Sequence, residues 1–244
     1  MPDPREALCY ALDVSTAGEA EEQVEMLAPF AGMFKVGLQL FLAEGPVLLS
    51  SLQAKGAGRI FLDLKLLDIP RTVRQAQKSA ARMPVDFLSV HCEGLLDRAA
   101  LPKPEGNEPL PGLLAVTLLT SLGEAELKRL GYRQDLSATE IVLLRAEIAR
   151  EAGCAGVVCS GMEVEPVRER LGPGFLIVTP GIRPSWVEVR GDDQARTRTA
   201  REAIRSGADI LVVGRPIRKA ADPADAARRI LDEIELGYRD RLGR

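Results

Sequence analysis

The residues with the clearest chemical potential lie in one short run, FLDLKLLDIP, at positions 61 to 70. If the run begins as a β-strand, alternate side chains share a face and each residue rises about 3.3 Å, so Asp63 and Lys65 project together about 6 to 7 Å apart. Phe61 would share their face, and the intervening leucines would take the other. The spacing therefore predicts two opposite charges on one face of a strand.

Such a pair is unusual inside a protein. In a parallel sheet covered by helices both faces of a strand are buried, so Asp63 and Lys65 would be enclosed. Removing an ionised group from water costs on the order of several kcal/mol, and the group keeps its charge only beside close partners. We therefore favour a catalytic role for the pair, with a purely structural ion pair as the alternative.

Asp68 follows the expected strand and stands just before Ile69 and Pro70. A proline is favourable at the first position of a helix, and an acidic side chain near that end interacts well with the helix dipole. Helix capping is therefore the alternative to a catalytic role for Asp68.

The elements that position these residues alternate along the chain, as in repeated βα units around a parallel sheet. Eight strands are expected, at residues 8 to 13, 33 to 37, 59 to 65, 87 to 92, 113 to 119, 155 to 160, 175 to 181 and 208 to 215. Helices are expected at about 16 to 29, 40 to 55, 71 to 82, 94 to 100, 123 to 131, 139 to 152, 163 to 171, 197 to 206 and 222 to 237. Proline and glycine make residues 101 to 112 a surface loop, on the face away from chemistry.

Eight βα units in 244 residues match one (β/α)8 barrel better than an open sheet with a second domain, because such barrels usually have about 250 residues. We therefore expect an α/β fold in which residues 1–244 form a single (β/α)8 TIM barrel domain.

Composition narrows the class of protein. A content of 46% hydrophobic and 27% charged residues is ordinary for a soluble globular protein, and no apolar run approaches the roughly 18 residues of a membrane span. The start of the chain has acids and prolines where a secretion signal has a basic and then an apolar stretch, so we expect the cytoplasm. The net charge of -3 argues against general binding of nucleic acid.

Several kinds of catalytic centre are disfavoured. The four cysteines lack CxxC spacing and are expected to be buried free thiols, without a disulfide framework or a zinc site. His91 is the only histidine, which excludes multi-histidine metal centres, and we favour a structural or hydrogen-bonding role for it over that of general base. The chain has no GxSxG or Walker sequence.

Polar residues gather at the ends of the expected strands, where barrels of this kind carry out chemistry. Beyond Asp63 and Lys65 they are Asp13, Lys35, Thr117, Thr120, Arg183, Gly214 and Arg215. None is specific alone, because an acid at a strand exit often caps the next helix, which is the alternative for Asp13. Their convergence on one mouth, with two acids and two lysines that can neutralise each other, favours an active site.

The last two strands carry the parts of a phosphate site, which barrels commonly build there from loop amides and a helix N-terminus. Gly214 lets backbone approach an anion, and Arg215 offers a forked, permanently charged donor. The long loop at 182 to 194 is hypothesised to close over the phosphate, with Arg183 and Gln194 as donors. The alternative is an exposed loop with Trp186 covering a hydrophobic patch.

Eight motifs together resemble the orotidine 5'-phosphate decarboxylase family over nearly the whole chain. They are ALD (11 to 13), KVG (35 to 37), FLDLKLLDIPRTV (61 to 73), VTLLTS (116 to 121), VVCS (157 to 160), VTPGIRP (178 to 184), DDQARTRT (192 to 199) and VVGRPI (212 to 217). The third contains DxKxxDIPxT, the signature of the family. The resemblance implies conversion of orotidine 5'-phosphate to UMP, the last step of de novo pyrimidine biosynthesis, without a cofactor or metal.

The resemblance also implies roles for residues. Lys65 would protonate C6 of the pyrimidine as carbon dioxide leaves, Asp63 would stand beside the departing carboxylate, and Lys35 would bridge Asp63 and the ribose. A homodimer is implied, in which Asp68 and Thr72 reach the site of the other subunit. The remaining implied ligand contacts are Asp13 to a ribose hydroxyl, Thr120 to the pyrimidine edge, and Arg183, Gln194, Gly214 and Arg215 to the phosphate.

The chain departs from the family pattern at Leu67, where histidine is frequent, and at Arg71, where a small or hydroxyl residue is frequent. Neither position contacts the ligand in this assignment, so the departures affect the expected interface packing rather than the expected activity.

Two other readings compete. Magnesium-dependent sugar-phosphate decarboxylases and aldolases of the same barrel superfamily also carry an Asp-x-Lys-x-x-Asp run, but DIP with Thr72 and DDQ at 192 to 194 favour the nucleotide enzyme. A non-catalytic barrel that binds a phosphate ligand has no need of buried lysine and aspartate pairs.

Overall fold

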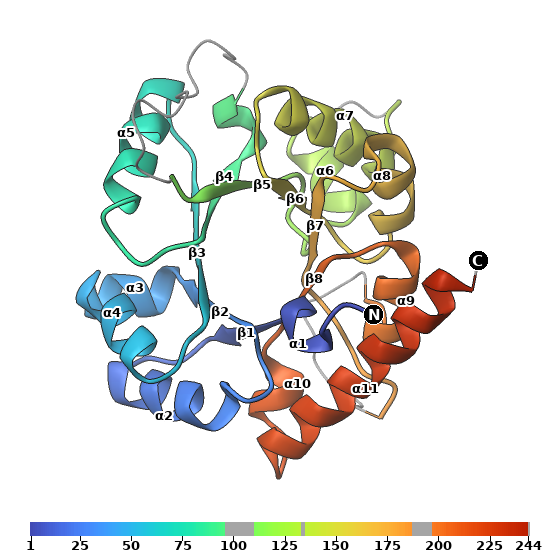
Figure 1. Ribbon diagram of the computed structural model, residues 1–244. Coiled ribbons are helices and arrows are strands. Elements are labelled where there is room, and N and C mark those ends of the chain that lie inside the picture. The colour runs from blue at the N-terminus through green and yellow to red at the C-terminus, as the bar shows by residue number, and fades with distance from the viewer. Residues whose placement is uncertain (96–109, 133–134, 187–196, 244) are drawn as a thin grey trace.

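The computed structural model describes residues 1–95, 110–132, 135–186 and 197–243. Its eight parallel strands close into a barrel in the order β1 to β8, so the expected (β/α)8 TIM barrel is confirmed (Figure 1). The strands are β1 (Leu8–Leu12), β2 (Met33–Gly37), β3 (Arg59–Leu66), β4 (Phe87–His91), β5 (Gly112–Val116), β6 (Gly156–Val158), β7 (Leu176–Thr179) and β8 (Ile210–Val213).

Helices surround the barrel (Figure 1). Those of the described residues are α1 (Pro4–Ala7), α2 (Ala17–Leu27), α3 (Leu38–Glu44), α4 (Val47–Ala54), α5 (Pro70–Ala80), α6 (Glu124–Arg129), α7 (Ala138–Glu151), α8 (Val164–Leu171), α9 (Ala200–Ser206), α10 (Arg215–Arg218) and α11 (Pro223–Leu242), with a 3₁₀ turn η1 (Cys92–Leu95). In the described part of the chain, no helix combines the length and apolar character needed to cross a bilayer.

Three expectations about the elements need correction. The helix expected at 40 to 55 is two helices, because Gly45 has φ +70° between them and Pro46 has no N–H to continue the first. The strand expected at 113 to 119 ends at Val116, where the chain leaves the sheet toward α6. Of the helix expected at 94 to 100, the described residues form only η1; the rest, and residues 101–109 of the expected loop, lie outside the described residues.

The core has two layers, as strand alternation requires. A small cluster fills the barrel and includes Phe61, Met33 and Val178. A much larger cluster lies between the strands and the helices and includes Leu62. Phe61 and Leu62 therefore point to opposite sides of β3, which confirms the predicted parity and directs Asp63 toward the barrel axis.

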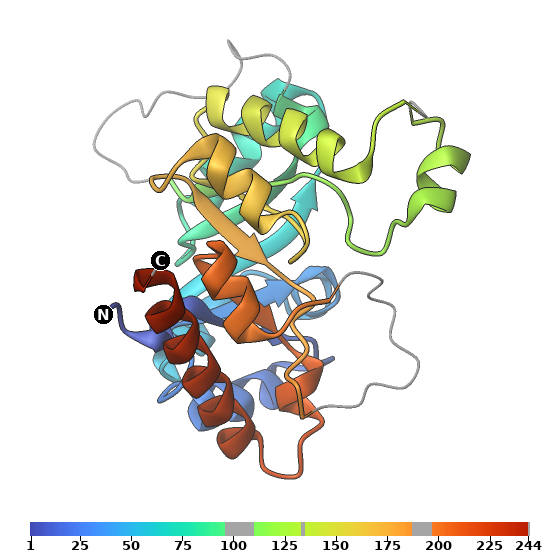
Figure 2. The same ribbon diagram turned by 90° about the vertical axis from the view of Figure 1, so that its right-hand side faces the viewer.

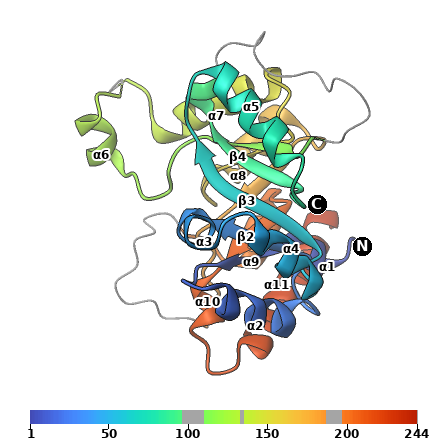
Figure 3. The same ribbon diagram turned by 90° about the vertical axis from the view of Figure 1, so that its left-hand side faces the viewer.

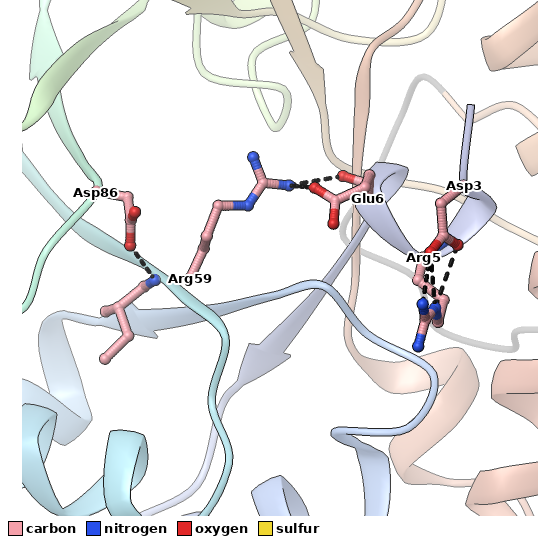
Figure 4. Close-up of polar contacts among 6 residues, drawn as sticks. Asp3, Arg5, Glu6, Arg59 and Asp86 are labelled. Atoms are coloured by element: carbon pink, nitrogen blue, oxygen red, sulfur yellow. Dashed lines mark hydrogen bonds and ion pairs between the residues drawn. The ribbon is translucent and has the colours of Figure 1, made fainter.

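The two ends of the barrel differ (Figures 2 and 3). Helix α6 projects from one end, and α1 and the last turn of α11 lie at the other. At the α1 end, Arg59 donates to the Glu6 carbonyl at 3.0 Å and pairs with its carboxylate at 2.7 Å, while Asp86 accepts the N–H of Ile60 at 2.8 Å (Figure 4). These contacts tie β3 to α1 and β4, so the α1 end is structural and the opposite mouth is left for chemistry.

Candidate active site

Four charged side chains meet where β1, β2 and β3 end, and we call Asp13, Lys35, Asp63 and Lys65 the charged cluster. The Lys65 Nζ atom lies 2.8 Å from Asp63 Oδ2, and Lys35 Nζ lies 3.7 Å from the same oxygen. Lys35 Nζ also lies 3.3 Å from Asp13 Oδ1. The structure therefore brings together four of the residues that the sequence predicted for the site, in a chain of alternating charge.

The members of the charged cluster are buried to different degrees. Asp63 is 8% exposed, and the Lys35 side chain is 12% exposed. The Lys65 side chain is 35% exposed, so it borders the mouth instead of being enclosed. The expectation that the strand would enclose both charges of the pair holds for Asp63 and fails for Lys65, because β3 is irregular at that residue.

Mutual attraction keeps the buried members charged. Burial alone would lower the pKa of Lys35, but the carboxylates of Asp63 and Asp13 outweigh burial and raise this pKa. Burial alone would raise the pKa of Asp63, but the ammonium groups of Lys35 and Lys65, with hydrogen bonds from Lys65 and Ser89, outweigh burial and lower it. Both groups are therefore ionised at neutral pH.

The backbone of β3 departs from a regular strand beside β4. Its register with β4 jumps from Leu62 opposite Leu88 to Leu66 opposite Val90. Within this bulge Lys65 has φ +49°, the one positive φ among the non-glycine residues that the structure describes. The fully buried Ser89 faces the bulge, accepts the Lys65 N–H at 2.8 Å and donates to Asp63 Oδ1 at 2.8 Å.

Sequence reasoning missed Ser89. The signal available was a serine in the otherwise apolar middle of FLSVHC, because a polar side chain in a buried strand needs a hydrogen-bond partner.

A cavity opens directly beside the charged cluster. It has a volume of about 220 Å³, and its lining includes Asp13, Lys35, Asp63, Lys65 and Gly37. The cavity places acids and ammonium groups around one space, which suits a ligand whose reacting atom must meet a proton donor.

Asp68 and Thr72 lie outside the charged cluster. Asp68 is exposed, and its Oδ1 accepts the N–H of Ile69 at 2.7 Å. Ile69, not Asp68, is the N-cap residue of α5, and no side chain forms a cap hydrogen bond there; Asp68 precedes the N-cap by one residue, so the interaction with the helix dipole stays an alternative. Thr72 is exposed in the first turn of α5. Within the described part of the chain, neither lysine of the cluster forms an ion pair with Asp68.

Thr120 lies half-buried in the turn that follows β5. Arg145 of α7 fastens the start of this connection, because it donates to the carbonyl of Thr117, pairs with Glu93 and donates to the Tyr132 hydroxyl at 3.0 Å. The guanidinium of Arg145 also lies over the ring of Tyr132, 5.4 Å from its centroid. Arg145 therefore links the start of the β5–α6 connection to η1 and to the segment that follows α6.

The predicted phosphate residues that the structure describes lie after β7 and β8. Gly214 precedes α10, and a Cβ placed there would lie 3.2 Å from Asp13 Oδ2 and 3.3 Å from the Ala11 Cβ, so glycine suits this close approach. Arg215 begins α10 and is half-buried. Arg183 is half-buried after β7 and donates to the Ile182 carbonyl at 2.9 Å. Gln194 lies outside the described residues.

Trp186, at the start of the predicted closing loop, is half-buried against the outer core, and the guanidinium of Arg229 lies 4.1 Å from its ring centroid. The patch-covering alternative therefore fits this residue. The loop beyond it, from 187 to 194, falls outside the described residues, so closure stays a hypothesis.

His91 ends β4 at the edge of the mouth and is half-buried. Its Nδ1 lies 4.0 Å from Glu93 Oε2. Burial lowers the pKa of His91, with Glu93 opposing and Lys65 adding to the effect, so the imidazole is neutral at pH 7. The structural or hydrogen-bonding role predicted for His91 stays a prediction.

The four cysteines, Cys9, Cys92, Cys154 and Cys159, are free and buried, as predicted. Burial raises the pKa of Cys9, Cys92 and Cys154 to about 12, so these thiols are protonated and poorly nucleophilic. Across the described ranges, no group of three or more His, Cys, Asp or Glu side chains is placed to hold a metal ion.

Comparison with known proteins gives one consistent result. A model of the orotidine 5'-phosphate decarboxylase / HUMPS family matches residues 6–230. The chain is 47% identical over 235 residues to the orotidine 5'-phosphate decarboxylase of Desulfosudis oleivorans, covering 95% of this chain and 94% of the relative. It is 45% identical over 240 residues to that of Moorella thermoacetica, covering 95% and 93%.

Solved structures agree. The orotidine 5'-phosphate decarboxylase of Lactobacillus acidophilus superposes with a TM-score of 0.75 at 34% identity, over 94% of this chain and 99% of that one. The corresponding structure from Pyrococcus horikoshii OT3 gives a TM-score of 0.71 at 26% identity, over 93% and 99%. Both the sequence likeness and the structural likeness extend over nearly the whole chain.

Proposed function

This chain belongs to the orotidine 5'-phosphate decarboxylase / HUMPS family, and we propose that its charged cluster decarboxylates orotidine 5'-phosphate with Lys65 as the proton donor. The protein is an orotidine 5'-phosphate decarboxylase, a carboxy-lyase of pyrimidine biosynthesis, as its relatives at 43% to 47% identity are. The observation that carries the proposal is the alternation of Asp13, Lys35, Asp63 and Lys65 around one cavity at the mouth of the barrel.

The chemistry explains why a fixed ammonium is needed. Loss of carbon dioxide from C6 of the pyrimidine leaves an electron pair in the plane of the ring, where the π-system cannot spread it. Stabilisation must therefore come from a preorganised positive charge beside that carbon. The Lys65 ammonium, held 2.8 Å from Asp63 at the cavity, supplies this charge and the proton that forms the new C–H bond.

Asp63 and Lys35 have different roles in the proposed reaction. Asp63 holds Lys65 in place and puts negative charge beside the substrate carboxylate, which favours its departure. Lys35 keeps Asp63 ionised from 3.7 Å away and reaches Asp13 at 3.3 Å, so it links the reacting end of the site to the ribose. Asp13 accepts a ribose hydroxyl, and Thr120 contacts the pyrimidine edge.

Phosphate binding falls to the ends of β7 and β8. The proposal assigns Arg183, Gln194, Gly214 and Arg215 to the phosphate, and it is supported by the position of Arg215 at the start of α10 beside Gly214. Contacts to the phosphate lie far from C6, yet their binding energy lowers the barrier when it is realised only in the transition state.

A further charge, Asp68, is proposed to come from a second subunit of a homodimer, with Thr72. Asp68 and Thr72 are exposed in a single chain. Large exposed apolar side chains flank Asp68, and others lie on α3 and α4, which follow the neighbouring strand; exposed apolar side chains of this size favour an interaction surface. They are Leu38 at 50% exposure, Leu42 and Val47 at 78%, Leu67 at 62% and Ile69 at 66%. A cytoplasmic location fits the pathway and is proposed with it.

The direct test is release of carbon dioxide from orotidine 5'-phosphate by the purified protein, with and without EDTA. Equal turnover in both conditions is expected. Turnover that disappears with EDTA and returns with magnesium would support the magnesium-dependent class instead, and binding of UMP without turnover would support a binding barrel.

A further inference from the structure

We propose that Ser89 is a positioning residue, whose hydroxyl holds the backbone of Lys65 and the carboxylate of Asp63 in the arrangement used for proton transfer. The inference rests on the proposed function, because it assigns Ser89 a role through Lys65 and Asp63 and no contact with the substrate.

The first step of the argument is the bulge in β3. Asp63, Leu64 and Lys65 lie between the paired residues Leu62 and Leu66, whereas Ser89 alone lies between their partners on β4. A bulge of this kind interrupts the regular ladder of hydrogen bonds and re-aims side chains, often beside active sites. The Lys65 N–H therefore needs an acceptor other than a ladder carbonyl.

The second step is the conformation of Lys65. A non-glycine residue at φ +49° is disfavoured by contact of its Cβ with the backbone, so surrounding interactions must hold it there. The Ser89 hydroxyl accepts the Lys65 N–H at 2.8 Å and supplies such an interaction. This left-handed turn lets the lysine side chain come back to Asp63 from only two residues away along the chain.

The third step is the carboxylate of Asp63, whose two oxygens are held separately. Ser89 donates its hydroxyl proton to Oδ1 at 2.8 Å, and the Lys65 ammonium donates to Oδ2 at 2.8 Å. One buried hydroxyl thus accepts from the backbone of Lys65 and donates to the residue that orients the ammonium of Lys65. Removal of the hydroxyl leaves the Lys65 N–H and Asp63 Oδ1 without that partner.

The test compares three variants. Ser89→Ala removes the hydroxyl, Ser89→Cys replaces it with a thiol of similar shape that is a weak donor, and Ser89→Thr retains the hydroxyl. The matched control is Ser160→Ala, because Ser160 is also a buried serine that donates to a carboxylate, that of Glu163, at the exit of β6. Each protein is assayed for kcat and KM with orotidine 5'-phosphate and for its thermal unfolding midpoint.

For Ser89→Ala and Ser89→Cys we expect kcat to fall about 10- to 100-fold, as for loss of a hydrogen bond to a charged group, with KM changed by less than about threefold. Ser89→Thr should recover most of kcat. Ser160→Ala should lose thermal stability while kcat stays within about twofold of wild type.

Wild-type kcat in Ser89→Ala or Ser89→Cys would overturn the proposal. A Ser89→Thr variant as slow as Ser89→Ala, or a loss confined to KM, would overturn it as well, since the hydroxyl would then not govern the chemical step. An inactive wild-type protein would instead refute the proposed function, so the two failures are distinguishable.

Discussion

Asp63→Asn tests the electrostatics of the charged cluster, because the amide keeps the shape of the side chain and its contact with Ser89 but removes the negative charge. Lys35, with 12% of its side chain exposed, then loses the carboxylate 3.7 Å away. At an effective dielectric constant near 20 that attraction is about 4 kcal/mol, but Asp13 remains 3.3 Å from Lys35, so we expect a net loss of unfolding free energy of about 2 to 3 kcal/mol.

The pH dependence of the loss follows from the pKa of Lys35. In the wild-type protein this pKa is raised, so Lys35 contributes stability that is present below the unfolded pKa of about 10.4 and disappears as pH rises through the folded value. In Asp63→Asn only the Asp13 carboxylate offsets the effect of burial on Lys35, so the pKa of Lys35 in the folded protein falls. The unfolded variant then binds more protons than the folded variant, so the unfolding free energy of the variant rises with pH. The difference in unfolding free energy between wild type and variant, the stability gap, should therefore narrow from pH 7 to pH 9.

Denaturant unfolding at both pH values measures this gap, and the decarboxylase assay measures kcat. We expect kcat at least about 100-fold lower, because Lys65 loses a charge-assisted hydrogen bond of 2.8 Å and the substrate loses its anionic neighbour. The control is Asp86→Asn, where Asp86 accepts the Ile60 N–H at the opposite end of the barrel (Figure 4). A stability gap that is absent, or the same at both pH values, would refute the reasoning.

Two further outcomes are expected. Gly214→Ala should raise KM about tenfold with a smaller change in kcat, because the added Cβ would lie 3.2 Å from Asp13 Oδ2. The control is Gly18→Ala, which should behave as wild type because no atom lies within 4 Å of its added Cβ. Equal KM values for the two variants would contradict the crowding argument. Mixing inactive Asp68→Ala with inactive Lys65→Ala protein should restore some activity through hybrid dimers that hold one intact site; no recovery after demonstrated subunit exchange would count against a shared site.

The sequence predicted the barrel and the charged cluster because both follow from short-range patterns. Strand parity alone predicted that Asp63 and Phe61 share one face of β3 and that Leu62 takes the other, and the structure confirms that Phe61 and Leu62 lie on opposite sides. The break between α3 and α4 had a signal in the sequence, since Gly45 and Pro46 together stop a helix, but we expected a single helix at 40 to 55.

Other features depend on contacts between strands and could not be predicted. The left-handed conformation of Lys65 and the bulge in β3 arise from the register with β4, which no pattern within residues 59 to 66 encodes. Ser89 was missed for the same reason, since its partners come from β3 rather than from its own strand. The assignment of Asp68 to a second subunit came from family resemblance and stays a proposal.

The most direct test of the central claim is the turnover number of Lys65→Ala on orotidine 5'-phosphate. The ammonium of Lys65 is the proposed proton source, so kcat should fall by several orders of magnitude, while the variant remains folded by circular dichroism and still binds UMP. Near-wild-type release of carbon dioxide by this folded variant would contradict the account.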